Sequence, residues 1–210
     1  AGALLAYAEH TQGRALAHVR NLQVERDDRL IDLPATTRRN LELTQTLRGE
    51  DSPTLFSLLD TCMTGMGSRQ LKQWLLEPSR DRSLAEHRQQ MIMALQGRGE
   101  ARGTGPWKSL RDALKGMSDV QRISARTALR QVRPRELVAL GLAMQRAELL
   151  RPMLASETVL QAFAVDLQTP PGLAELLQRA ICENPPVVIR EGGVIADGYD
   201  AELDELRQLS

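Results

Sequence analysis

The stretch TTRRN at residues 36–40 combines hydroxyl, guanidinium and amide groups that could bind an anion. If a helix begins here, after Pro34, its unpaired N–H groups and the arginines could hold a phosphate. The same residues could instead form the cap and first turn of a helix that binds no ligand. A cation in the first turn opposes the helix dipole, so we interpret Arg38 and Arg39 as partners of a neighbouring helix and keep direct phosphate contact as the alternative.

A second group of cations, Arg122, Arg126 and Arg130, recurs every four residues, and Arg133 and Arg135 follow. On a helix this spacing places the first three on one face, where they could neutralise the phosphates of a DNA backbone. The alternative is that they pair with carboxylates of neighbouring helices or face solvent. We favour this alternative because the formal net charge of the chain is +0, whereas a nucleic-acid-binding domain usually carries an excess of positive charge.

No strong motif for catalysis, nucleotide binding or metal binding is present. Residues 65–72, GMGSRQLK, have glycines and a lysine, but they lack the Gly-Lys-Ser/Thr spacing of a phosphate loop and no predicted strand precedes them. We interpret them as a tight turn before a helix that contains Trp74. The histidines and cysteines do not have the spacing of metal ligands; they are His10, His18, His87, Cys62 and Cys182. We therefore predict no catalytic, cofactor-binding or metal-ligating residue, and we expect both cysteines to be buried and reduced.

The composition predicts a folded chain with its own core. Its 210 residues are 42% hydrophobic and 26% charged, which suggests one domain or one elongated unit. Aromatic residues make up only 3%, too few for a platform on which single-stranded bases stack. The sequence has no signal peptide and no apolar run that could cross a bilayer, and it begins and ends within helical patterns, so we expect a piece of a larger cytoplasmic protein.

Apolar residues recur at helical spacing through most of the chain. After Ser52 and Pro53, which suit a cap and a first helical position, a helix is predicted to run until Gly65 and Gly67 end it. Its apolar face consists of Leu55, Leu58, Leu59, Cys62 and Met63. Further helices are predicted to begin at Thr36 or Thr37, Ser83, Ser118, Pro134 and Asp200, with Pro152 ending the one that begins at Pro134.

Two segments depart from the helical period. Residues 21–26 and 28–34 alternate around Asp27 and Asp28, and residues 187–196 alternate around Gly192 and Gly193, so each is predicted to form a small β-hairpin. Strands and helices do not alternate as they do in parallel α/β folds. The sequence therefore predicts a mainly α fold with two small β-hairpins.

Several ordered blocks together resemble the bacterial MutS family of DNA mismatch-recognition proteins. The blocks are GALLAYAEHTQG, TTRRNLEL, TLFSLLDTCMTGMGSRQLKQWLLEP, MSDVQRISARTALRQVRPRELVAL and ENPPVVIREGGVIADGYDAELDELR. They run from about Gly2 to the end of the chain. The resemblance implies the central core and lever region, an elongated multi-helix bundle, known in that family as domain III.

The resemblance also implies a division of the chain and a set of functions for the parent protein. Residues 1–33 would form a helix leaving the connector domain and a β-hairpin, residues 34–183 the helical core, and residues 184–210 a hairpin and the start of the lever helix towards a DNA clamp. The parent would be a homodimeric, DNA-dependent ATPase that binds double-stranded DNA, ATP and Mg²⁺ in the cytoplasm, near the nucleoid, during the response to DNA damage. This fragment would be non-catalytic and would couple the parent's own ATPase domain to its clamp, without contacting a membrane.

Neither the family's Phe-x-Glu mismatch wedge nor its Walker A loop is present, so no catalytic or base-reading residue is transferred. The residues that we assign a structural or coupling role are Thr37, Arg38, Arg39, Asn40, Gly67 and Arg69. The alternative function is direct DNA-backbone binding by the basic stripe from Arg122 to Arg135, with Arg122, Arg126 and Arg130 as the contacts.

Overall fold

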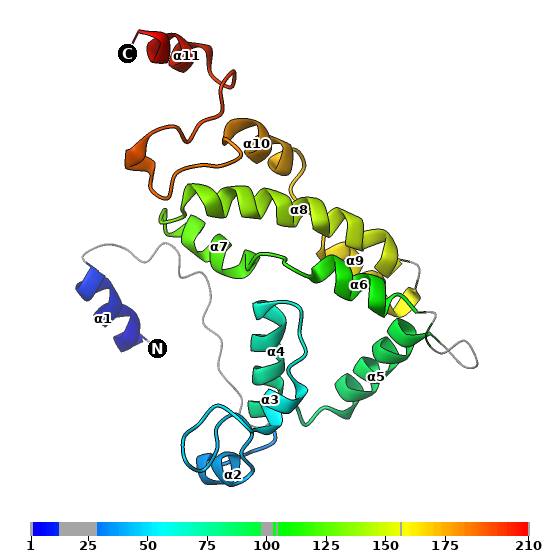
Figure 1. Ribbon diagram of the computed structural model, residues 1–210. Coiled ribbons are helices and arrows are strands. Elements are labelled where there is room, and N and C mark those ends of the chain that lie inside the picture. The colour runs from blue at the N-terminus through cyan, green and yellow to red at the C-terminus, as the bar shows by residue number, and fades with distance from the viewer. Residues whose placement is uncertain (1, 13–28, 98–102, 104, 156, 210) are drawn as a thin grey trace.

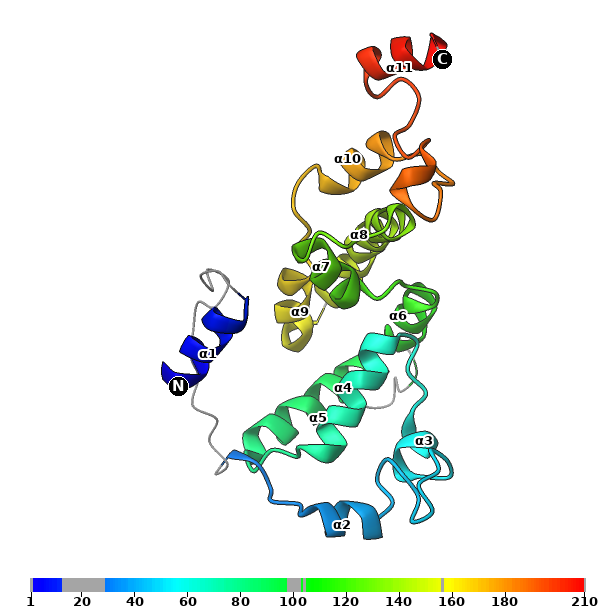
Figure 2. The same cartoon turned by 90° about the vertical axis from the view of Figure 1, so that its left-hand side faces the viewer.

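The computed structural model describes residues 2–12, 29–97, 103, 105–155 and 157–209, and it is elongated and mainly helical (Figures 1 and 2). The helices are α1 (Gly2–Gln12), α2 (Ala35–Asn40), α3 (Leu55–Leu59), α4 (Gly65–Leu76), α5 (Arg82–Gln96), α6 (Trp107–Leu114), α7 (Val120–Ala128), α8 (Pro134–Ala155), α9 (Gln161–Asp166), α10 (Leu173–Ala180) and α11 (Ala201–Gln208). Short 3-10 segments are η3 (Thr158–Leu160) and η4 (Ile189–Glu191). The prediction of a mainly α fold is confirmed.

Helix α8 is the centre of the packed body, and α6, α7, α9 and α10 all pack against it. Its buried side chains recur at helical spacing along the contact face, and they include Leu140, Ala143, Ala147 and Leu150. Alternating leucine with alanine fills the core while letting neighbouring helices approach closely. The body therefore forms around one long helix, as the leucine spacing of the sequence indicates.

The two ends of the molecule lie far apart along its long axis. Figures 1 and 2 both place α2 and α3 at one end and α11 at the other, with the α8 body between them. The segment after α10 is attached to the body by Arg135 of α8, whose Nε donates to the carbonyl oxygen of Pro185 at 3.0 Å. Helix α1 lies to one side of the body in both views, and its Leu4 and Tyr7 are exposed.

The prediction of a hairpin at residues 187–196 is wrong. This segment contains η4, and Ile195 forms an isolated antiparallel bridge with Ile181. Residues 187–193 are exposed and only residues 194–196 are half-buried, so the apolar alternation indicated neither the 3-10 turn nor the partner of Ile195, which lies at the end of α10. The other predicted hairpin, at residues 21–34, falls largely outside the described residues; in the part that is described, Leu30 forms an isolated bridge with Ser79.

Several helices start at residues other than the predicted ones. Thr54, Asp81 and Asp119 cap α3, α5 and α7, in place of the predicted Ser52, Ser83 and Ser118. Helix α2 begins after Pro34, with no side-chain cap from Thr36 or Thr37. In each capped case the hydroxyl or carboxylate accepts from an N–H of the first turn, which is the physical reason for these starts.

Glycine and proline have weaker effects here than predicted. Gly65 and Gly67 lie in the first turn of α4, where Thr64 caps the helix by accepting from the Gly67 N–H at 3.1 Å. Pro152 lies inside α8 and does not end it. The helix predicted to reach residue 63 ends at Leu59, so Cys62 lies in an exposed loop and the prediction that it is buried is wrong.

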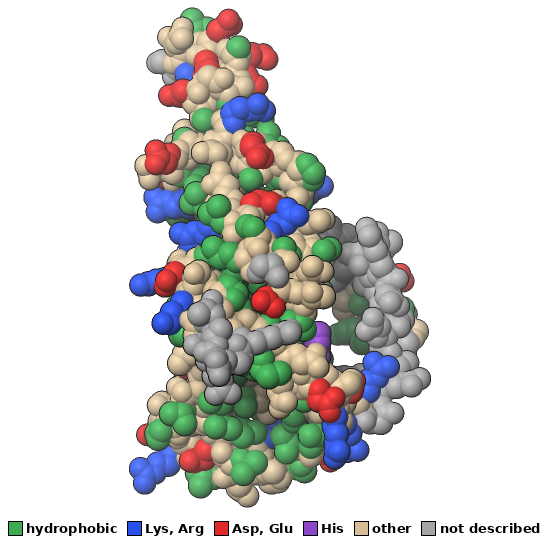
Figure 3. Space-filling model, turned by 90° about the vertical axis from the view of Figure 1, so that its right-hand side faces the viewer, with side chains coloured by type: hydrophobic (Ala, Val, Ile, Leu, Met, Phe, Trp, Pro, Cys, Tyr) green, Lys and Arg blue, Asp and Glu red, His purple; other side chains and the backbone are tan. Residues whose placement is uncertain are grey.

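The chain exposes an unusually large surface for its mass. Its accessible area is 16065 Å², whereas a compact monomer of the same mass, 23.3 kDa, exposes about 9,700 Å². Hydrophobic side chains are spread over the face in Figure 3. Among the described helices, none combines the length and apolar character needed to span a membrane.

Candidate functional site

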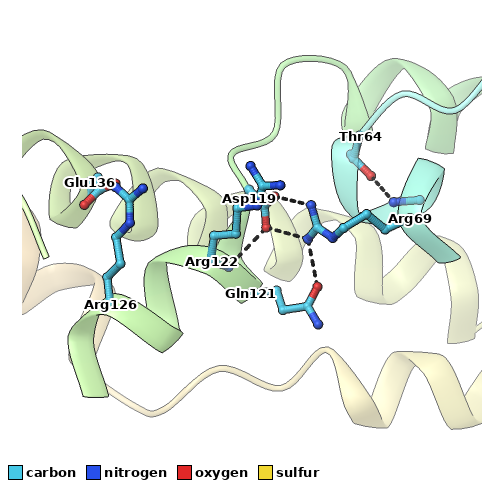
Figure 4. Close-up of polar contacts among 8 residues, drawn as sticks. Thr64, Arg69, Asp119, Gln121, Arg122, Arg126 and Glu136 are labelled. Carbon is cyan, nitrogen blue, oxygen red and sulfur yellow. Dashed lines mark hydrogen bonds and ion pairs between the residues drawn. The ribbon is translucent and has the colours of Figure 1, made fainter. Parts of the chain in front are cut away.

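A polar cluster built on Arg69 and Asp119 joins the start of α4 to the start of α7 (Figure 4). Arg69 Nη1 lies 2.6 Å from Asp119 Oδ2, and Arg69 Nη2 lies 2.9 Å from Asp119 Oδ1. Arg69 Nη2 also donates to Gln121 Oε1 at 2.8 Å. A bidentate guanidinium–carboxylate pair fixes orientation as well as distance, so this cluster sets how α4 meets α7.

Asp119 has two structural roles at once. Besides its pair with Arg69, its Oδ1 accepts from the backbone N–H of Arg122 at 3.1 Å and so caps α7. The hydrogen bond from Arg69 lowers the pKa of Asp119, and the same bond raises the pKa of Arg69. The stabilisation from this pair is therefore complete above the ordinary pKa of aspartate and is lost only as the pH falls through the lowered pKa.

Of the two glycines at the start of α4, Gly67 lies where a Cβ would be crowded, whereas a Cβ on Gly65 would meet only ordinary contacts. A Cβ on Gly65 would lie 3.8 Å from both Arg69 Nη1 and Asp119 Oδ2. A Cβ on Gly67 would lie only 3.3 Å from Cys62 Cβ and from the capping oxygen of Thr64. Gly67 therefore permits the tight turn before α4, which gives the predicted structural role of this glycine a physical basis.

The predicted basic stripe is divided between two carboxylates. Arg126 forms an ion pair with Glu136 of α8, and Arg122 Nε lies 3.5 Å from Asp119 Oδ2. Glu136 also accepts from the Arg133 N–H at 2.9 Å, at the start of α8. Two of the three predicted DNA contacts thus face a negative partner, and the remaining one, Arg130, is exposed on the last turn after α7.

The predicted anion-binding stretch lies in α2 and the turn that follows. Because α2 begins at Ala35, Arg38 and Arg39 fall in its last turn, where cations complement the helix dipole, and the prediction that they occupy the first turn is wrong. Arg38 Nε donates to the Leu33 carbonyl oxygen at 2.7 Å, and Arg39 Nη2 donates to that of Leu47 at 3.1 Å.

Both arginines line a cleft of about 320 Å³ at this end of the molecule. Thr37 is half-buried and Asn40 is exposed at the end of α2. The arginine contacts join α2 to the segments before and after it, because the acceptors are backbone carbonyl groups of loops. The prediction that these arginines contact a neighbouring helix is therefore wrong.

The histidines and cysteines that the structure describes are not brought together as a metal site. His10 and His87 are exposed on α1 and α5, and His18 lies outside the described residues. Cys62 and Cys182 are both free thiols. Within the part of the chain that the structure describes, no group of three or more His, Cys, Asp or Glu side chains could hold a metal ion.

Sequence reasoning named Arg69 but missed its partner. Asp119 lies fifty residues away, and nothing in the local pattern links the two positions. The signal that could have found Asp119 is its place before Val120, where an aspartate can cap a helix as well as the predicted Ser118.

A comparison with known protein families gives a match over most of the described helices. A family model described as MutS domain III matches residues 36–210, which contain the α8 body, the Arg69–Asp119 cluster and both ends of the elongated frame. This match covers most of the chain. The chain therefore belongs to the MutS domain III family, the core domain of MutS-like mismatch-repair proteins.

Proposed function

We propose that this domain is the non-catalytic core and lever of a mismatch-recognition protein, and that it couples the ATPase domain of that protein to its DNA clamp. The observation that carries the proposal is the elongated arrangement of helices from the α2–α3 end through the α8 body, with α11 joined at the opposite end by a largely non-helical segment (Figure 2). ATP binding at one site can change DNA binding at another only if the elements between them are stiff and have discrete arrangements.

In this proposal the parent protein supplies the chemistry and this domain supplies the connection. The parent would be a cytoplasmic homodimer that binds double-stranded DNA, with ATP and Mg²⁺ bound in its own ATPase domain. Residues 34–183 would form the core, residues 1–33 its link to a preceding domain, and residues 184–210 the start of the lever.

The large exposed area supports contact with other parts of such a protein. Side chains on α8 and α11 that would suit a packed interface, including Leu142, Leu149 and Leu206, are exposed. Exposed leucines on a helix surface are available for contact with another domain or chain. The clamp and the ATPase domain are the partners that the coupling function requires.

We expect the double variant Arg38→Ala with Arg39→Ala, in the intact protein, to weaken the coupling between ATP and DNA by about 0.5–2 kcal/mol. Removing both guanidinium groups frees α2 from the carbonyl oxygens of Leu33 and Leu47, so this end of the frame loosens. The measurement is ATP-triggered release from mismatched DNA, beside ATP affinity measured without DNA.

Arg48→Ala is the matched control, because Arg48 is an exposed arginine in the turn next to Leu47. The proposal predicts slower release and unchanged ATP affinity for the double variant alone. Unchanged release in the double variant, or release slowed equally in the control, would contradict it.

The second candidate function, direct binding of the DNA backbone by α7, rests on the exposure of Arg130 and the helical spacing of Arg122, Arg126 and Arg130. Its expected affinity is low because the first two face Asp119 and Glu136. Binding of duplex DNA to this chain, titrated with salt, separates the candidates. Submicromolar affinity that falls steeply with salt would favour DNA binding, and weak binding with a shallow slope would favour the lever.

A further inference from the structure

Helices α4 and α5 and the α6–α7 segment form three sides of a triangular frame. Figure 1 shows α4 and α5 diverging from a common corner and meeting the α8 body at separate places. With about 1.5 Å of rise per residue, the 12 residues of α4 and the 15 of α5 make sides of roughly 18 and 22 Å. The angles of such a frame depend on how each corner is held.

The corner between α4 and α5 is held by backbone hydrogen bonds from residues 29–31. The Ile31 N–H donates to the Pro78 carbonyl oxygen at 2.8 Å, and the Arg80 N–H donates to that of Arg29 at 2.9 Å. The bridge between Leu30 and Ser79 adds to them. This corner is thus tied into a third segment of chain.

The corner between α5 and the body is apolar. Helix α5 packs against η3, and Ala94 and Leu160 at these elements are each only 1% exposed. Close packing of this kind is insensitive to salt and opens only when the core is disrupted.

The third corner lies between α4 and α7. Its described polar contacts are made by side chains, whereas the first corner is held by backbone hydrogen bonds and the second by apolar packing. The Arg69 side chain is 37% exposed and that of Asp119 is 25% exposed, so solvent reaches the pair. Exposed ion pairs contribute little to global stability, yet a bidentate pair strongly restricts geometry. This corner can therefore open while the helices on either side stay folded.

We propose that the Arg69–Asp119 pair is a latch that closes this frame and fixes the angle at which α4, with α3 packed on it, leaves the α8 body. With the latch closed, the α2–α4 end moves as one unit with the body. With the latch open, the other two corners remain, and α4 turns about its corner with α5. The latch is a property of this fold and would operate whether or not the domain couples ATP to DNA.

The test is a distance distribution between spin labels on the two sides of the latch. The labels are attached to Gln70→Cys on α4 and Leu149→Cys on α8, which are both exposed positions, after Cys62 and Cys182 have been replaced by alanine. The distance between the two labels is then measured in the chain with the latch intact and in each variant. Arg69→Met removes the guanidinium group but keeps an apolar stem, so we expect a broader distribution with a shifted mean. In the chain that keeps Arg69 and Asp119, we expect the distance distribution to broaden in the same way at high salt, because salt screens exposed charges.

Arg122→Met is the matched control. It removes another guanidinium group from the same carboxylate, but Arg122 lies on α7 and does not cross the corner. We expect it to leave the distribution unchanged. Asp119→Ser is the second latch variant, because serine can still cap α7 while losing the bidentate contact, and it should broaden the distribution as Arg69→Met does.

Helical circular dichroism should be unchanged in both latch variants, with a melting temperature lowered by no more than about 4 °C. The latch is contradicted if Arg69→Met gives the same distribution as the unaltered chain or as Arg122→Met. It is equally contradicted if Arg69→Met unfolds the chain, because the pair would then be a core contact and not a latch.

Discussion

Replacing Leu160 with alanine is expected to lower the free energy of unfolding by about 2–5 kcal/mol, the range for a leucine in a packed core. Leu160 is 1% exposed in η3, and η3 packs against α5, α8 and α9. The truncation removes apolar contacts from several helices at once and leaves a cavity that the neighbouring helices can fill only in part. Urea unfolding of the purified chain, followed by circular dichroism, measures the change.

Leu149→Ala is the control for this prediction, since Leu149 is a leucine of α8 that is 65% exposed. Its effect should stay within about 0.5 kcal/mol, as for most surface substitutions. Equal changes in the two variants would mean that the α5–η3 contact is not part of the stable core.

Replacing Gly141 with leucine is expected to destabilise the chain by about 1–3 kcal/mol through overpacking between α8 and α10. Gly141 is buried, and a Cβ placed on it would lie 3.5 Å from Leu177 Cβ and 3.8 Å from the Ala174 carbonyl oxygen. A single methyl group fits at these distances, whereas a leucine side chain would push α10 away from α8.

Gly141→Ala is the matched control and should raise the free energy of unfolding by up to about 1 kcal/mol, because alanine has the higher helix propensity and its Cβ meets only ordinary contacts. Thermal and urea unfolding of both variants give the comparison. A stability loss in the alanine variant as large as that in the leucine variant would show that α8 and α10 pack more tightly than the structure indicates.

The sequence predicted the helices well because the signal for a helix is local. The helix that the sequence predicted to begin at Pro134 is α8, and Leu140, at the helical spacing of its apolar residues, is buried together with Ala143 and Ala147. Boundaries were less predictable, because several residues near a helix start can serve as its cap. Asp119 and Ser118 are both residues that can cap a helix. The contact between Asp119 and Arg69, which the local sequence does not reveal, adds a second interaction that favours Asp119 as the cap.

The bridges and the ion pairs could not be predicted for a different reason, since both depend on partners that belong to other elements of the fold. Ile195 pairs with Ile181 and not across the Gly192-Gly193 turn, and Leu30 meets Ser79. Arg126 and Glu136 lie on different helices, so the spacing of the arginines indicated a shared face but not the carboxylate opposite it. Local patterns fix which segments are regular, whereas the fold decides which of them meet.

The most direct test of the proposed coupling is the distance between the two ends of this domain in the intact mismatch-repair protein. Spin labels at exposed positions 58 on α3 and 205 on α11 report that distance with and without ATP and mismatched DNA. A stiff coupling element predicts a small set of discrete distances whose populations shift with each ligand. A single distribution that neither ATP nor mismatched DNA alters, in a protein that still releases DNA on ATP binding, would contradict the account.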